Sequence, residues 1–230
     1  RYTERLLNAL QKELRLDRQP RHIECFDNSN LQGAHPVASC VVFRDGKPAR
    51  KEYRHFNIKT VEGPDDYASM REVVFRRYSR LQEEGAELPD LIIADGGKGQ
   101  MGIIHEVLEY LGLDIPVAGL AKNDRHRTSE LLCGYPPVLV GIRPTSPLFH
   151  FLAHIQEEVH RFAVSFHRQK RSKAFIHSEL EQIEGVGDKT VQTLLRHFRT
   201  VEKVRAANIE ELSALVGAAK AKKIRAFFEK

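Results

Sequence analysis

The spacing of apolar positions predicts one helix and three strands at the start of the chain. Residues 4–15 carry leucines at helical spacing, and a proline ends this segment soon afterwards. Two apolar runs, 22–26 and 36–43, have the composition of buried strands, with turn residues over 28–33 between them. An Asp-Gly pair then marks a hairpin, and residues 51–58 alternate as a third strand would. These segments predict a three-stranded antiparallel meander.

Helical and strand patterns alternate through the middle of the chain. Residues 63–66 have the Pro and acidic composition of a helix start, and 91–95 suits a strand buried on both faces. Residues 96–99 turn the chain into a second helix, and 117–120 is a further strand. Loops and short strands are expected before a helix that starts at Ser-Pro and continues over 146–166. This order predicts an α/β fold with a mixed sheet flanked by helices.

The pattern becomes all-helical towards the C-terminus. Residues 180–198 and 201–228 are predicted to form short helices with tight connections. We therefore expect the domain boundary near residue 172, which gives domains 1–172 and 173–230. Both are long enough to bury a core.

The charge of the chain is mildly basic, with a formal net charge of +5. This balance fits a nucleic-acid partner, although many proteins without one are as basic. The stretch 161–173 is more informative, because it carries five Lys and Arg residues and no acid. It is either a solvated linker or a strip that binds phosphates.

Several other classes of protein are excluded. No apolar run approaches the roughly 18–20 residues that a membrane span needs, so no membrane association is expected. Cys25, Cys40 and Cys133 are too unevenly spaced for a disulfide framework or a zinc site. We expect Cys25 and Cys40 to be buried thiols in a cytoplasmic protein. The chain begins without Met, so we expect it to be a fragment of a longer protein.

Two aspartates stand at the ends of apolar runs, where a carboxylate is costly unless it is paired or bound to a metal. Asp27 follows the run 22–26, and Asp95 ends the run 91–95. If the two strands are neighbours, both carboxylates project into one pocket at the carboxyl edge of the sheet. Such a pocket would suit Mg²⁺ or Mn²⁺. The alternative is that each Asp caps the turn that follows it.

The last helix of the first domain offers candidates for a third ligand. Glu157 and His160 are three positions apart and share a helical face. His154, Glu158 and His167 are nearby competitors. The pattern of residues alone does not choose among them.

The glycines that follow Asp95 offer a place for a phosphate. Residues 96–99 do not have the spacing of a nucleotide-binding loop. With Lys98 at the N-terminus of a helix, they could still hold a phosphate.

The most specific local signal lies over residues 180–190. It predicts a helix, a Gly-apolar-Gly hairpin and a second helix, in which the glycines let a DNA phosphate approach the backbone. This is the helix-hairpin-helix pattern, which contacts the DNA backbone and not the bases. The alternative is a plain helical hairpin with a glycine cap. A second copy over 212–227 keeps Gly217 but has lost the second glycine, so we expect it to bind phosphate less well.

A series of motifs occurs in a fixed order along nearly the whole chain. They are residues 23–30, 37–43, 65–67, 95–100, 119–122, 160–163 and 183–187. Together they resemble the C-terminal half of the UvrC family, the incision subunits of bacterial nucleotide excision repair.

The resemblance implies a ribonuclease H-like endonuclease domain followed by a tandem helix-hairpin-helix domain. It implies an Asp-Asp-His triad, here Asp27, Asp95 and His160, acting as catalytic residues and as ligands of Mg²⁺ or Mn²⁺. It also implies incision on the 5′ side of a lesion, in double-stranded DNA with a lesion, nick or bubble. In the family, the N-terminal half holds a second nuclease and the region that docks onto UvrB, and neither is expected in this chain.

The residues expected to contact DNA fall into two groups. Contacts to phosphates near the triad are expected from Lys98, Lys122, Arg161 and Arg168. Contacts from the hairpins are expected from Gly185, Val186, Gly187, Lys189, Thr190 and Gly217.

Two other functions remain open from the sequence. One is a scaffold that holds DNA through the hairpins without cutting it, with Asp27 and Asp95 as structural caps. The other is a different ribonuclease H-like nuclease, such as the endonuclease V type, against which the helical tail argues. Dependence of the activity on a divalent metal separates the nucleases from the scaffold, because backbone binding needs no metal.

Overall fold

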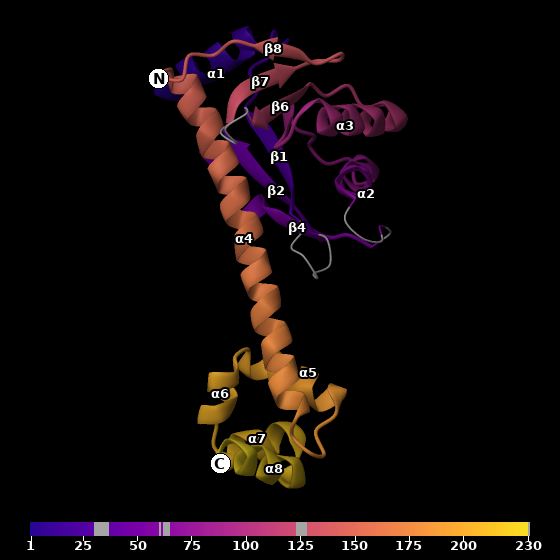
Figure 1. Ribbon diagram of the computed structural model, residues 1–230, viewed down its shortest axis with the longest axis vertical. Helices are drawn as coiled ribbons and strands as arrows, with labels where there is room; N and C mark the ends of the chain where they lie inside the picture. The colour runs from indigo at the N-terminus through magenta and orange to yellow at the C-terminus, as the bar shows by residue number, and fades with distance from the viewer. Residues whose placement is uncertain (30–36, 60, 62–64, 123–127, 230) are drawn as a thin grey trace. The chain divides into compact units, whose positions relative to one another are not determined.

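The computed structural model (Figure 1) divides the chain into two compact units, residues 1–165 and residues 166–230. Each unit has a hydrophobic core of its own. The residues that the structure describes are 1–29, 37–59, 61, 65–122 and 128–229.

The first unit is built on a mixed sheet. Among the described residues the sheet has eight strands: seven follow the order β3-β2-β1-β5-β6-β7-β8, and β4 pairs with β2 off this path. The pairs β1–β5 and β5–β6 are parallel, and the others are antiparallel, which confirms the predicted mixed sheet and the antiparallel meander. The strands are β1 (His22–Ser29), β2 (Val37–Arg44), β3 (Lys47–Pro48), β4 (Arg54–Asn57), β5 (Leu91–Ala94), β6 (Val117–Lys122), β7 (Thr128–Cys133) and β8 (Val138–Val140).

Helices cover both faces of this sheet (Figure 1). They are α1 (Tyr2–Glu13), the 3₁₀ helix η1 (Arg50–Glu52), α2 (Asp66–Glu83), α3 (Lys98–Leu111) and the first part of α4 (Pro147–Glu181). The Tyr78 ring of α2 contacts Phe26 of β1, with 5.9 Å between ring centroids. Phe151 of α4 contacts Phe43 of β2 at the same centroid separation. Phe43 pairs with Ile23, so these two side chains lie on the same face of the sheet. Ile23 and Phe26 are three positions apart on β1, so their side chains lie on opposite faces. Helices α2 and α4 therefore cover opposite faces of the sheet.

Local chemistry explains several element boundaries. Asp45 and Gly46 have φ values of 51° and 78°, as a two-residue hairpin between β2 and β3 requires, so the predicted hairpin is confirmed. The Asp65 side chain caps α2 by accepting a hydrogen bond from the Ala68 N–H at 3.0 Å. Helix α3 ends at Gly112, whose φ of 70° places it in the left-handed region.

A buried ion pair joins β1 to α2. Glu24 is 1% exposed, and its two carboxylate oxygens accept hydrogen bonds from Arg77 at 2.7 and 2.8 Å. The Tyr78 hydroxyl donates to the same carboxylate at 2.7 Å. Burial alone would raise the pKa of Glu24, but the hydrogen bonds and charge of Arg77, together with His22, lower it to about 2. The carboxylate is therefore ionised in the folded protein.

Three segments differ from the expectation. Asn28 and Ser29 were predicted as turn residues, but they belong to β1 because they pair with Ala38 and Val37 of β2. The rest of the predicted turn, 30–33, lies outside the described residues. The predicted strand over 51–58 is shorter, because its first residues belong to η1. Helix α4 continues well past residue 166, since no Pro or Gly interrupts the chain before Glu181.

Helix α4 also contains the basic stretch that is expected to be either a linker or a phosphate-binding strip. Its backbone is helical there, while the side chains of 166–178 lie outside the described part of the structure. In the described part of the chain, no helix combines the length and the apolar character that a membrane span requires.

The buried thiols are found as predicted. Cys25 and Cys40 are fully buried in the sheet, and burial raises the pKa of both thiols. Cys133 is partly exposed, and all three cysteines are free.

The second unit is all-helical, as predicted. After α4 come α5 (Asp188–Phe198), α6 (Val201–Ala206), α7 (Ile209–Val216) and α8 (Ala218–Phe228). Side-chain caps start two of these helices: Thr200 accepts from the Lys203 N–H at 3.2 Å, and Asn208 accepts from the Glu211 N–H at 2.8 Å. The core of the unit is formed by residues that include Leu180, Val191, Leu194, Val204, Leu212 and Ile224.

Candidate active site

Parallel pairing of β1 with β5 brings the two predicted carboxylates together. In this ladder Phe26 pairs with Ala94, so Asp27 and Asp95 stand side by side at the next position. The Asp95 N–H continues the ladder by donating to the Phe26 carbonyl at 2.9 Å. The Asp27 side chain is 11% exposed and that of Asp95 is 3% exposed. The strands are therefore neighbours, as the pocket prediction requires.

His160 of α4 completes this cluster. Its Nδ1 lies 3.2 Å from Asp27 Oδ2, and its Nε2 lies 3.0 Å from Asp95 Oδ2. The hydrogen bond to Asp27, followed in size by the hydrogen bond to Asp95, raises the pKa of His160 to about 10, although burial acts to lower it. The imidazole ring is therefore protonated at neutral pH in this arrangement, and it offsets part of the negative charge of the two carboxylates.

The donor set of the cluster fits a small divalent cation. One ligand atom from each of Asp27, Asp95 and His160 lies within 4.8 Å of the others. Two carboxylates and an imidazole are ligands that Mn²⁺ and related cations accept. The two carboxylates that face His160 favour positive charge in this pocket.

Another residue on α4 holds one of the carboxylates and was not predicted. Gln156 is buried, and its Nε2 donates to Asp95 Oδ1 at 2.8 Å. The sequence contained a usable signal, because Gln156 lies four positions before His160 and so shares its helical face. A polar residue one helical turn from a metal-binding histidine can hydrogen-bond to another ligand of the same metal and so hold that ligand in place.

The competing acid Glu158 has a different role. Its carboxylate is buried and accepts hydrogen bonds from the Tyr53 hydroxyl at 2.7 Å and from Arg161 at 2.9 and 3.1 Å. The hydrogen bond from Arg161 is the main cause that lowers the pKa of Glu158 to about 2. Tyr53 lies between η1 and β4, so this contact anchors α4 to the sheet next to His160.

The other competitors do not join the cluster. Glu157 is exposed, and His154 contacts the Phe43 ring with 5.4 Å between centroids. The side chain of His167 lies outside the described part of α4. Among the described candidates on α4, His160 is therefore the one that reaches both carboxylates.

A row of polar residues extends from Asp27 across two more strands. Asp27 pairs with Ser39, and Ser39 pairs with His55, so all three lie on one face of the sheet. Ser39 Oγ and His55 Nδ1 are 3.3 Å apart. The His55 ring also stacks on Phe162 of α4, with 3.7 Å between centroids. This row was not predicted, because strand pairing and not sequence spacing assembles it.

The glycine loop after Asp95 ends at the start of α3. Gly97 is the N-cap residue of α3 and provides no side-chain cap, and Lys98 is exposed at the first helical position. The Tyr67 hydroxyl lies so close to Gly99 that a Cβ there would collide with it. The loop therefore combines helix N–H groups, one cation and a tyrosine hydroxyl next to Asp95.

Of the other three predicted phosphate contacts, the structure describes the side chain of Arg161. Arg161 donates two hydrogen bonds to Glu158, and its side chain is 54% exposed. The side chains of Lys122 and Arg168 lie outside the described part of the chain.

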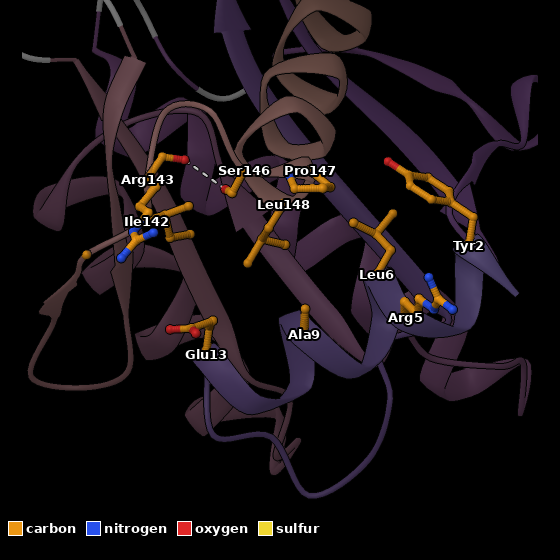
Figure 2. A pocket seen from close by; sticks show the side chains of 11 residues that line it. Tyr2, Arg5, Leu6, Ala9, Glu13, Ile142, Arg143, Ser146, Pro147 and Leu148 are labelled. Atoms are coloured by element: carbon orange, nitrogen blue, oxygen red, sulfur yellow. Dashed lines mark hydrogen bonds between the residues drawn. The ribbon is translucent and has the colours of Figure 1, made fainter.

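An apolar groove of about 480 Å³ lies between α1 and the start of α4, away from the carboxylates. Figure 2 shows Leu6 and Ala9 of α1 facing Leu148 across it. None of the residues that line the groove belongs to the Asp27, Asp95 and His160 cluster.

In the second unit, the predicted hairpin residues connect α4 to α5. Gly185 has a φ of +80°, and Gly187 is the N-cap residue of α5. Val186 is buried, whereas Lys189 is exposed. Thr190 is 6% exposed. In the second copy, Gly217 alone separates α7 from α8 and has a φ of +91°.

The fold and the cluster define a class of protein: a ribonuclease H-like endonuclease domain followed by helix-hairpin-helix motifs. Residues 11–164 match the family model of the UvrC RNase H endonuclease domain, and residues 178–230 match a SAM-like helix-hairpin-helix tandem. The chain belongs to the UvrC family. This confirms the resemblance and the predicted fold class, and it favours the UvrC interpretation over the endonuclease V alternative.

Similar chains from several bacteria are named UvrABC system protein C. The one from Bacteroides fragilis is 58% identical over 221 residues, which are 96% of this chain and 36% of that protein. The one from Streptococcus uberis is 54% identical over 216 residues, 94% of this chain and 36% of that protein. The chain thus spans little more than a third of the length of these relatives.

Solved structures with a similar arrangement are more distant. Ciona intestinalis endonuclease V, in complex with a 24mer DNA containing an inosine followed by a ribo-adenosine, has a TM-score of 0.36 at 12% identity. That match covers 61% of this chain and 83% of that chain. Human ENDOV has a TM-score of 0.31 at 12% identity, covering 70% of this chain and 98% of that chain.

Proposed function

We propose that this chain is a divalent-metal-dependent DNA endonuclease that makes the 5′ incision beside a lesion in bacterial nucleotide excision repair, in the cytoplasm. The observation that carries the proposal is the cluster of two carboxylates from adjacent parallel strands with His160 of α4, within 4.8 Å of one another. Membership of the UvrC family supports the same activity.

In this mechanism Asp27 and Asp95 would hold Mg²⁺ or Mn²⁺ as oxygen ligands, and a His160 ring nitrogen would complete the set after losing its proton to solvent. The cation would stabilise the charge that develops at the scissile phosphate and lower the pKa of the attacking water. Gln156 would keep Asp95 oriented through its hydrogen bond to Oδ1. His160 is 45% exposed, so its ring can exchange protons with solvent at the edge of the cluster.

Other residues would place the DNA strand against these carboxylates. The N-terminus of α3, with Lys98 and the N–H groups after Gly97, would bind a phosphate next to the scissile one. Lys122, Arg161 and Arg168 are proposed as further phosphate contacts. The hairpin residues Gly185, Val186, Gly187, Lys189 and Thr190, with Gly217, would hold the DNA backbone.

The substrate is proposed to be double-stranded DNA with a lesion, nick or bubble, because the cluster and hairpins would contact backbone and not a particular base. UvrB is the proposed protein partner of the longer protein. We place the domain boundary near residue 172, inside α4. The two family matches support this position, because one ends at residue 164 and the other begins at residue 178.

The proposal is tested by cleavage of a nicked or lesion-bearing duplex with Mn²⁺ or Mg²⁺. Asp27→Ala and His160→Ala are compared with Glu157→Gln, an exposed change on the same helix outside the cluster. We expect cutting by the parent chain and the Glu157 variant, and none by the two cluster variants, while all four bind DNA. Cutting by Asp27→Ala would refute the assignment of the cluster. DNA binding without cutting in either metal would instead favour a non-catalytic scaffold, or a nuclease that needs its partner.

A further inference from the structure

The two glycine connections of the helical unit are not equivalent. The first connection joins α4 to α5 through several residues that include Gly185 and Gly187. The second is Gly217 alone, and α8 begins at the next residue. The second connection therefore has no loop comparable to the first, so whatever it contributes to DNA binding must come mainly from α8.

One lysine of α8 lies across the first hairpin. A Cβ at Gly185 would be 2.5 Å from Lys223 Nζ and 3.1 Å from its Cδ. The end of the Lys223 side chain thus lies beside the Gly185 backbone. The positive φ of Gly185, which residues with a Cβ rarely adopt, explains why the position is a glycine.

A second lysine of α8 contacts the start of α5. Lys220 Nζ donates a hydrogen bond to Thr190 Oγ1 at 3.0 Å, in the first turn after the hairpin. Lys220 and Lys223 are three positions apart, so they share one face of α8. Two ammonium groups from the second motif therefore meet the loop and the helix start of the first motif.

Among the residues that the structure describes, these two cations have no acidic partner. Neither Lys220 nor Lys223 forms an ion pair with a carboxylate in the described part of the chain, although Glu184 and Asp188 flank the glycines. By contrast, Arg205 and Arg225 of the same unit pair with Glu179 and Glu229. Unneutralised ammonium groups beside a glycine loop and a helix N-terminus favour an anion at that place.

We propose that the first hairpin and the face of α8 that carries Lys220 and Lys223 form one composite site for a phosphodiester group of DNA. The first motif supplies the glycine backbone and the N-terminus of α5, and the second motif supplies the cations. This inference rests on the proposed function, because it specifies how the helical unit holds the DNA backbone. Gly217 is the N-cap of α8 as Gly187 is of α5, so the second connection lacks a counterpart of Gly185, and the lysines of α8 would compensate for that loss.

The neighbouring Lys222 offers a matched control. It has the same charge and the same helix, but it lines a different surface with Asn208 and Ile209. The full chain is prepared with Lys220→Gln, Lys223→Gln or Lys222→Gln. Binding to a fluorescently labelled duplex with a central bubble is measured over a series of salt concentrations without divalent cations, so that cleavage does not interfere.

We expect Lys220→Gln and Lys223→Gln each to reduce the slope of log affinity against log salt by about 0.9, the value for one lost phosphate contact. Lys222→Gln is expected to keep the slope of the parent chain. Lys220→Arg and Lys223→Arg should restore it, because they keep the charge. Circular dichroism melting of each variant separates loss of the site from loss of the fold.

The possible results distinguish this inference from the proposed function. If the parent chain binds no DNA, both are wrong. If it binds and Lys222→Gln lowers the slope as much as the other two changes, DNA binding stands but the composite site is refuted, because only general charge matters. Unchanged slopes in folded Lys220→Gln and Lys223→Gln variants would refute the composite site as well.

Discussion

The carboxylate cluster and the glycine hairpin are built in opposite ways. Asp27, Asp95 and His160 come from two strands and a helix that are far apart in the sequence, and strand pairing brings them together. Gly185 and Gly187 belong to one short connection. A site assembled over long sequence distances depends on the whole sheet, whereas a local loop depends mainly on its own residues. The two should therefore respond to mutation differently.

The largest expected effect separates cutting from binding. Asp95→Asn keeps the shape of a buried side chain but removes the charge that would hold a cation. We expect cleavage to fall by roughly 10³-fold, because metal stabilisation of the transition state is worth several kcal/mol and ~1.4 kcal/mol is a factor of ten. DNA affinity, measured by fluorescence anisotropy, should stay within about twofold. A parallel loss of affinity would show that the two sites are not separable.

The next effect concerns the fold that supports the cluster. Glu24→Gln leaves Arg77 buried without its carboxylate partner, and the Arg77 side chain is 12% exposed. We expect the free energy of unfolding to fall by about 3–5 kcal/mol, as for other broken buried ion pairs. Urea unfolding followed by circular dichroism measures this change. Glu157→Gln, which alters an exposed carboxylate, is the control and should leave stability within about 0.5 kcal/mol.

The same ion pair predicts a pH dependence. The folded-state pKa of Glu24 is about 2, below its ordinary value of 4.5, so its stabilising contribution is complete above pH 4.5. It is lost as the pH falls from 4.5 towards 2. Glu24→Gln should flatten the fall in stability over that range. If the free energy of unfolding falls equally in the variant and the parent chain between pH 4.5 and 2, carboxylates other than Glu24 control the acid unfolding.

A smaller effect is expected at the residue that orients Asp95. Gln156→Ala removes the hydrogen bond to Asp95 Oδ1 but no proposed metal ligand. We expect the Mn²⁺ concentration needed for half-maximal cleavage to rise about tenfold, the lower end for loss of such a supporting hydrogen bond. Cleavage at saturating Mn²⁺ should largely recover. Failure to recover would mean that Gln156 contributes to the reaction itself.

The smallest effect is local to the helical unit. Asn208→Ala removes the side-chain cap of α7 and should cost about 1 kcal/mol. Hydrogen exchange should become faster at the first amides of α7, while cleavage of saturating DNA stays unchanged. A change in cleavage would show that the stability of the helical unit is coupled to the activity of the first unit.

Local chemistry made much of this molecule predictable. The Asp-Gly hairpin after β2, the buried run of β5 and the Gly-Val-Gly connection each follow from residues next to one another. The two aspartates were also identifiable, because a carboxylate at the end of an apolar run needs a partner. The length of α4 was underestimated, because a run of basic residues resembles a linker although nothing in it prevents a helix.

The residue pattern alone determined that this protein has two carboxylates poised for a site, a glycine hairpin and an α/β domain followed by helices, because backbone preferences and burial act over short distances. Only the tertiary structure decided which residues of α4 face the carboxylates, because the packing of the helix turns His160 and Gln156 towards Asp95 and turns Glu158 towards Tyr53. The tertiary structure also places Ser39 next to His55 and Lys223 next to Gly185. Those contacts depend on strand register and helix packing, which no local pattern encodes.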